Sequence, residues 1–254
     1  CLPPGAWDEL SLWLGLPCDQ KITNPSTFNS PAIHQVAGRN CRAFLRGVRF
    51  HGRPAHADQL HLDVWWDGVN ILQDAGTYGY NDAPPWQNAF CTTRVHNTLV
   101  VNDKDQMEQA GKFLWLNQAN AKWLPSEDGT SLCARHDGYR RLGILHQRSV
   151  EFLSDDHLRI NDLVSQKKPV ENLVRIHWLL SDWEWEMDRQ SLHLHKGNHT
   201  LRIMLNALAV DSKVQIRPLE LGLIRAGKTV YGTYHNEIMG WVSETYREKS
   251  PALS

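Results

Sequence analysis

Short runs of alternating apolar and polar residues, separated by turn residues, dominate this chain after position 33. They include CRAFLRGVRF, QLHLDVWWDG, HNTLVVND, LGILHQRSVEFL, HLRINDLV, SLHLHKG and HTLRIML. Because successive side chains of a strand point to opposite faces, this period of two predicts half-buried β-strands. Several runs recur roughly every 8–12 residues, as in sandwiches and barrels. The pattern predicts an all-β fold, a large antiparallel two-sheet β-sandwich of the supersandwich kind.

The first 32 residues do not follow this pattern. The segment DELSLWLGL has helical spacing and ends at Pro17, and KITNPSTFNSP after it is rich in linker residues. The sequence therefore predicts a short helix and linker over residues 1–32 and one β-sandwich domain over residues 33–254.

Composition excludes several classes of partner and leaves the compartment open. Lys and Arg number 27 and Asp and Glu 28, so a net charge of −1 gives no signature of nucleic-acid or anionic-membrane binding. No stretch approaches the roughly 18 apolar residues of a membrane span. Five widely spaced cysteines make a poor disulfide framework. The 11 tryptophans are assigned mostly to the core, with a few as sugar-stacking candidates.

Two histidines and an aspartate stand within 41 positions on successive predicted strands: His56, Asp74 and His96. Two imidazoles and a carboxylate, with a fourth position left for water or substrate, form a complete zinc set of the catalytic type. Calcium prefers all-oxygen sites and fits less well. Asp58 is a candidate second-sphere acceptor for the free N–H of a ligand histidine. The structural alternative is a set of His–Asp hydrogen bonds that order loops.

A predicted hairpin complicates this ligand set. Asp67-Gly68 is a turn signal that would pair Trp66 with Val69. Counting outward from that pair places His61 opposite Asp74, so His61 is the alternative partner of this carboxylate. For His56 to reach Asp74, its segment must curl over the strand end or the ladder must carry a bulge.

The order of several short motifs resembles the C-terminal part of the heparinase II/III-like polysaccharide lyases. These motifs are HADQLHLDVWW, DAGTY, HNT, HDGYRRLG and GWVSETYREKSPALS. The resemblance implies a β-sandwich beside an N-terminal (α/α) toroid, whose tail would be residues 1–32. It also implies one metal ion on His56, Asp74 and His96, and β-elimination on an acidic, uronic-acid-containing polysaccharide or oligosaccharide. Periplasmic or secreted location is favoured by the family.

The resemblance also implies that this chain alone is inactive. In the family the toroid supplies the Tyr and the Asn or His that transfer protons. Family members often read H-x-H-A-D, with the first His near the substrate, and here Pro54 stands at that position. His51, three positions earlier, could replace it only if the loop folds back.

Residues 78–94 hold the candidates for contact with substrate. A tyrosine, Tyr78 or Tyr80, could transfer a proton. Arg94 could pair with a uronate carboxylate, whose neutralisation stabilises the enolate-like transition state. Trp86 could stack on a sugar ring. The structural alternative is that the tyrosines cap a hairpin and Arg94 forms an internal ion pair.

Two other functions compete with the lyase. Pro54 and the high tryptophan count are compatible with a non-catalytic carbohydrate-binding or scaffolding module. His56, Asp58 and His96 could form the facial triad of a non-haem iron oxygenase. That second alternative leaves Asp74 and its Gly-Thr-Tyr sequel unexplained.

Overall fold

Burial alternates along the strands as their sequences predict. In the computed structural model, strand β10 (Ile144–Ser154) buries every second residue from Ile144 to Val150. Strand β2 (Cys41–Arg46) buries Cys41, Ala43 and Leu45 in the same manner. The structure describes residues 30–77, 81, 87–126, 130–168, 170–188, 191–204 and 206. Among them the elements are strands and three short 3-10 helices, so the all-β prediction is confirmed.

The described residues fall into two compact units. The first contains residues 30–74 and Cys91–Trp178, and the second contains Ala75–Phe90 and the chain from Leu179 onward. The predicted domain over 33–254 stays a prediction, and the predicted helix before residue 30 lies outside the described residues.

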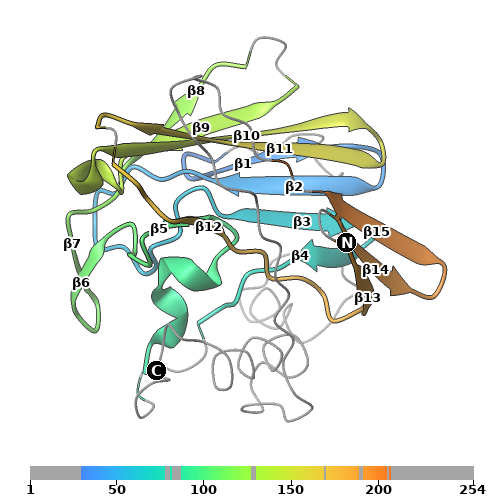
Figure 1. Ribbon diagram of the computed structural model, residues 1–254, viewed down its shortest axis with the longest axis horizontal. Helices are drawn as coiled ribbons and strands as arrows, with labels where there is room; N and C mark the ends of the chain where they lie inside the picture. The colour runs from blue at the N-terminus through green and yellow to red at the C-terminus, as the bar shows by residue number, and fades with distance from the viewer. Residues whose placement is uncertain are drawn as a thin grey trace, which may run out of the picture. The chain divides into compact units, whose positions relative to one another are not determined.

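Two four-stranded antiparallel sheets form most of the first unit (Figure 1). One has the order β1 (Ile33–Ala37), β2, β3 (Leu62–Trp66) and β4 (Val69–Leu72). The other has the order β11 (His157–Gln166), β10, β9 (Leu132–His136) and β8 (Ala121–Leu124). Two small ladders pair β5 (Leu99–Val101) with β12 (Val174–Ile176), and β6 (Glu108–Gly111) with β7 (Leu114–Leu116). The 3-10 helices are η2 (Ala89–Cys91), η3 (Thr93–Val95) and η4 (Arg140–Leu142).

Strand β1 lies against β9 and β10, so the two large sheets adjoin one another. At this junction the ring of His34 on β1 stacks on Trp123 of β8, with centroids 3.6 Å apart and planes 4° from parallel. The completely buried side chains of Ala43, Leu45 and Val150 come from both sheets. Burial of such apolar surface is the main stabilising contribution to the sandwich.

The second unit contains one three-stranded antiparallel sheet. Its strands are β13 (Glu184–Met187), β14 (Ser191–Lys196) and β15 (His199–Met204), in that order. Leu192 and Leu194 of β14 are buried. Gly197, with φ 59°, occupies the turn between β14 and β15 that the sequence predicts.

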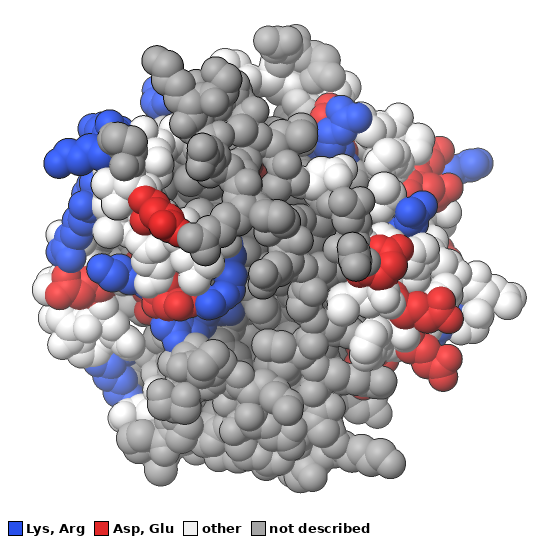
Figure 2. Space-filling model, in the orientation of Figure 1, with Lys and Arg blue, Asp and Glu red and all other residues white. Residues whose placement is uncertain are grey.

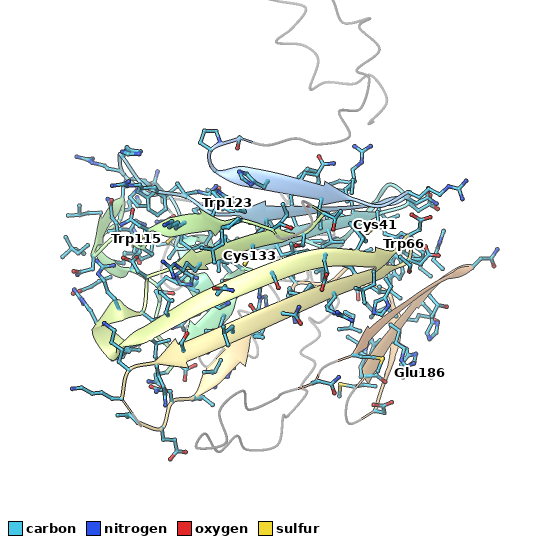
Figure 3. The ribbon with its side chains drawn as sticks, turned by 90° about the horizontal axis from the view of Figure 1, so that it is seen from above. Cys41, Trp66, Trp115, Trp123, Cys133 and Glu186 are labelled. Carbon is cyan, nitrogen blue, oxygen red and sulfur yellow. The ribbon has the colours of Figure 1, made fainter. Side chains whose placement is uncertain are left out.

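The β3–β4 hairpin corrects the predicted register. Asp67 and Gly68 have φ of 48° and 78°, a left-handed pair typical of a type I′ turn, and Trp66 pairs with Val69 as expected. Figure 3 labels Trp66 beside Cys41, its partner on β2. A bulge then intervenes, because Trp65 pairs with Asn70 but Val64 pairs with Leu72. The extra residue and the end of the ladder at Leu72 mean that His61 is not paired with Asp74.

The surface carries charges of both signs. Both acidic and basic side chains stand among the described residues on the face in Figure 2. Among the described residues, no helix is long and apolar enough to cross a membrane.

Candidate metal centre

Three histidines and an aspartate converge beyond the ends of β3 and β4. His56 Nδ1 lies 3.2 Å from His96 Nε2, which lies 3.7 Å from Asp74 Oδ2. His61 Nε2 lies 3.4 Å from the same Asp74 oxygen. The His96 side chain is fully buried, whereas 41% of the Asp74 side chain is exposed. The cluster is therefore buried at His96 and exposed to solvent at Asp74.

The backbone determines which nitrogen of His96 carries the proton. His96 follows η3, and its Nδ1 lies 2.7 Å from the carbonyl oxygen of Thr92. A carbonyl only accepts, so Nδ1–H donates and the neutral ring keeps a lone pair on Nε2. This is the usual arrangement of a metal-ligating histidine, whose second ring nitrogen donates to a backbone carbonyl. The lone pair lies at the atom nearest to both His56 and Asp74.

His61 has the opposite tautomer. The backbone N–H of Asn97 donates to His61 Nδ1 at 3.0 Å, so the proton of the neutral ring is on Nε2. His61 thus presents a proton, and not a lone pair, to Asp74. Burial lowers the pKa of His61 to about 4 against the opposing effect of Asp74, and the ring stays neutral near pH 7.

A second carboxylate also approaches the histidine pair. Asp58 is buried, and its ligand atom and those of His56 and His96 all lie within 4.8 Å of one another. Its Oδ1 also lies 2.8 Å from Nε of Arg46, which balances its charge. The described residues therefore bring together a possible three-residue metal site, His56, Asp58 and His96. Asp74 adjoins this site through His96.

Hydrogen bonds at the residues on either side of His56 hold its segment in place. The Trp115 indole N–H donates to the Ala55 carbonyl at 3.3 Å, and Ala57 N–H donates to the Cys91 carbonyl at 2.8 Å. Ala57, Cys91 and Trp115 also belong to one buried apolar cluster. This explains how a loop without strand pairing can hold an imidazole in place.

The positions that depart from the family pattern lie in the same loop. Pro54 is buried, whereas His51 is exposed. Among the described residues, the possible metal group does not include His51.

The Asn and Thr of the HNT motif hold backbone groups. Asn97 Nδ2 donates to the carbonyls of Leu62 and Gln73, both at 2.9 Å. Thr98 Oγ1 donates to the carbonyl of Gln59 at 2.8 Å. All three donations are buried, so these side chains join β3, β4 and the loop before β3 around the histidines.

A second polar cluster, not predicted from the sequence, lies in the β9–β10–β11 sheet. It consists of His136, His146, Arg148 and Asp162, all buried or nearly so. The signal was present in the strand pattern. His146 and Arg148 alternate with Ile144 and Val150, so they share the buried face, where polar groups require partners.

Most substrate candidates cannot be placed. Tyr78, Tyr80 and Trp86 lie outside the described residues. Arg94 is half-buried, and its Nη2 donates to the Asp103 carbonyl at 3.2 Å. This contact is a hydrogen bond to the backbone, and the internal ion pair expected as the structural alternative for Arg94 stays a prediction.

Comparison with known proteins gives one family. A family model described as heparinase II/III-like, C-terminal, matches residues 43–247. A heparin-sulfate lyase from Bacteroides stercoris is 32% identical over 154 residues, covering 58% of this chain and 20% of the relative.

Solved structures agree on the fold. A heparan sulfate lyase, HepC from Pedobacter heparinus, superposes with a TM-score of 0.55 at 18% identity, covering 80% of this chain and 33% of that one. A heparinase III superposes with a TM-score of 0.55 at 18% identity, covering 75% of this chain and 30% of that one. This chain therefore spans about a fifth of the curated relative and about a third of the similar structures.

Proposed function

We propose, since the chain belongs to the heparinase II/III-like family through its C-terminal domain, that it is the metal-binding β-sandwich of a polysaccharide lyase. The reaction would be β-elimination on a uronic-acid-containing polysaccharide. The principal proton-transfer residues would lie on an N-terminal toroid, which is the proposed partner domain. The chain by itself is then expected to be inactive.

One observation carries the metal part of this proposal. The His96 Nε2 atom, which carries the lone pair, lies 3.2 Å from His56 Nδ1 and 3.7 Å from Asp74 Oδ2. Neutral His56 has two tautomers. In one, its Nδ1–H donates to His96, and in the other, Nδ1 carries a lone pair and can serve as a second ligand. Nitrogen and carboxylate ligands in this number suit zinc.

We propose Asp74 as the carboxylate ligand and Asp58 as a supporting group. Asp58 already faces the Arg46 guanidinium at 2.8 Å, whereas the Asp74 carboxylate is 41% exposed and lies near both His96 and His61. His61 would then help to orient the Asp74 carboxylate. The proposed ligands are thus His56, Asp74 and His96, with His61 outside the first coordination sphere.

The chemistry requires neutralisation of the sugar carboxylate, which a cation, an amide or a metal can provide. A bound zinc ion would supply a positive charge for this purpose, or would fix the loops that line the cleft. Of this chain's own residues, Tyr78 or Tyr80 would contribute to proton transfer, Arg94 would pair with a uronate, and Trp86 would stack on a sugar ring. Charge neutralisation makes the C5 proton more acidic and stabilises the enolate-like transition state.

Elemental analysis of the purified chain tests the site. About one zinc per chain is expected in the wild type and in His61→Ala, and none in His56→Ala or Asp74→Ala. His157→Ala on β11 is the control, because this exposed histidine lies on another sheet. The absence of metal from a folded wild-type protein would refute the metal site and favour a carbohydrate-binding or scaffolding module.

A non-haem iron site is the alternative that should be tested together with the proposed zinc site. The His56–Asp58–His96 group has the composition of a facial triad of non-haem iron. Iron that is lost in Asp58→Ala and kept in Asp74→Ala would support that alternative. Zinc with the reverse dependence would support the lyase site.

A further inference from the structure

A completely buried arginine connects the second sheet to the candidate metal centre. Arg148 on β10 is 0% exposed, and its Nε and Nη2 donate to the two oxygens of Asp162 at 2.8 and 3.0 Å. Its Nη1 donates to two carbonyls of other segments, those of Leu60 at 2.8 Å and Asn97 at 2.6 Å. The guanidinium also lies over the ring of Trp178, 5.0 Å from its centre. A planar fork with donors in fixed directions suits this set of acceptors.

Both carbonyls adjoin histidines of the site. The Leu60 carbonyl belongs to the peptide that joins Leu60 to His61, and Asn97 directly follows His96. Leu60 has φ of 58°, a left-handed conformation that residues with a Cβ rarely adopt. Such conformations persist where the surroundings impose them, often at functional sites. One guanidinium group therefore holds the backbone beside His61 and His96 together.

Arg148 is itself oriented by a chain of hydrogen bonds with a single direction. The N–H of Gly138 donates to His136 Nδ1 at 3.1 Å, which leaves His136 Nε2–H to donate to His146 Nδ1 at 3.0 Å. His146 Nε2–H then donates to Asp162 Oδ1 at 2.6 Å. Each histidine is thereby fixed in one neutral tautomer. A Cβ at Gly138 would lie 2.9 Å from His136 Nδ1, so this close approach requires glycine.

We propose that Arg148, oriented by Asp162 and His146, is a positioning residue that holds the backbone segments of His61 and His96 in the arrangement that binds metal. The effect on metal affinity rests on the proposed function. The effect on the two segments does not, because it follows from the contacts of Arg148 alone.

The test uses the full chain and two measurements. Zinc affinity is measured by competition with a chromophoric chelator, and hydrogen–deuterium exchange is followed by mass spectrometry in peptides containing Leu62 and Asn97. These two amides donate to the Asn97 carbonyl and to His61 Nδ1. The variants are Arg148→Lys, which keeps the charge without the fork, and Arg148→Met.

Arg159→Lys and Arg159→Met are the matched controls. Arg159 lies on β11, next to β10, and its exposed side chain pairs only with Glu151 among the contacts described for it. The Arg148 variants are expected to bind zinc about 10–100-fold more weakly and to exchange faster at both amides. The controls are expected to match the wild type. Wild-type affinity and exchange in folded Arg148 variants would overturn the proposal.

Two further outcomes distinguish a failure of this proposal about Arg148 from a failure of the proposed metal site. If the wild type binds no zinc, the proposed metal site fails, and exchange alone decides whether Arg148 positions these segments. If the Arg148 variants do not fold, His146 decides. His146→Gln retains a donor toward Asp162, so it should preserve zinc affinity, whereas His146→Leu should weaken it. Equal affinity in the two His146 variants would overturn the proposal.

Discussion

Asn97 is the residue whose change should test most directly whether the HNT motif supports the backbone around the histidines. Its amide nitrogen donates to two buried carbonyls, and the Asn97→Asp substitution replaces that donor with an acceptor of the same shape. Each buried carbonyl left without a donor costs about 1–3 kcal/mol, so the expected loss is roughly 2–6 kcal/mol. This is a large part of the about 5–15 kcal/mol that stabilises a typical domain. Asn97→Ala should lose a similar amount, because it removes the same two donations.

Urea denaturation followed by tryptophan fluorescence measures this loss as a change in the free energy of unfolding. Asn161→Asp on β11 is the control, because its exposed amide donates only a long 3.4 Å hydrogen bond to Ser149. Exposed substitutions of this kind usually change stability by less than about 0.5 kcal/mol. If Asn97→Asp and Asn161→Asp had the same free energy of unfolding, the assignment of Asn97 to backbone support would be wrong.

Two further predictions follow from buried titratable groups. Burial lowers the pKa of His177 to about 4 and that of His136 well below 6.5, so at these two sites the folded chain binds fewer protons than the unfolded chain, whereas burial of Asp63 raises its pKa to about 6 and acts in the opposite direction. Stability should therefore fall as pH drops below about 6.5 toward 4, by roughly 1.4 kcal/mol per pH unit for each histidine, and an unchanged urea midpoint would contradict this. Burial also raises the pKa of the Cys91 thiol to about 12, whereas Cys133, whose thiol pKa is also raised by burial, is only half-buried. Iodoacetamide should modify Cys133 well before Cys91 in the native protein, as peptide mapping would reveal.

Much of the fold follows from local pattern. The longest alternating runs became β10 and β11, and the Asp67-Gly68 turn formed where a left-handed pair of residues was expected. The role of Asn97 and Thr98 in holding backbone groups was also predictable, because these residues open a strand directly after a histidine.

The strands that the pattern did not reveal are short or lack alternation. Strand β6 has four exposed residues, EQAG, and β8 is AKWL, with one exposed and three half-buried residues. Both acquire strand structure by pairing with a neighbour, β7 or β9, so the cause lies outside their own sequence. Strand propensity depends strongly on such tertiary context.

The candidate site was harder to predict because it depends on one extra residue. A regular ladder would place His61 directly opposite Asp74, but the bulge after Asn70 shifts the strand before it ends at Leu72. Asp74 then lies close to both His61 and His96, and the Asn97 N–H places the proton of the neutral His61 ring on the nitrogen nearer that carboxylate. No alternation pattern contains that information, because the tautomer depends on a backbone amide 36 residues away. Sequence can therefore nominate the histidines of such a site, whereas the hydrogen bonds to their outer nitrogens determine which of them can present a lone pair to a metal ion.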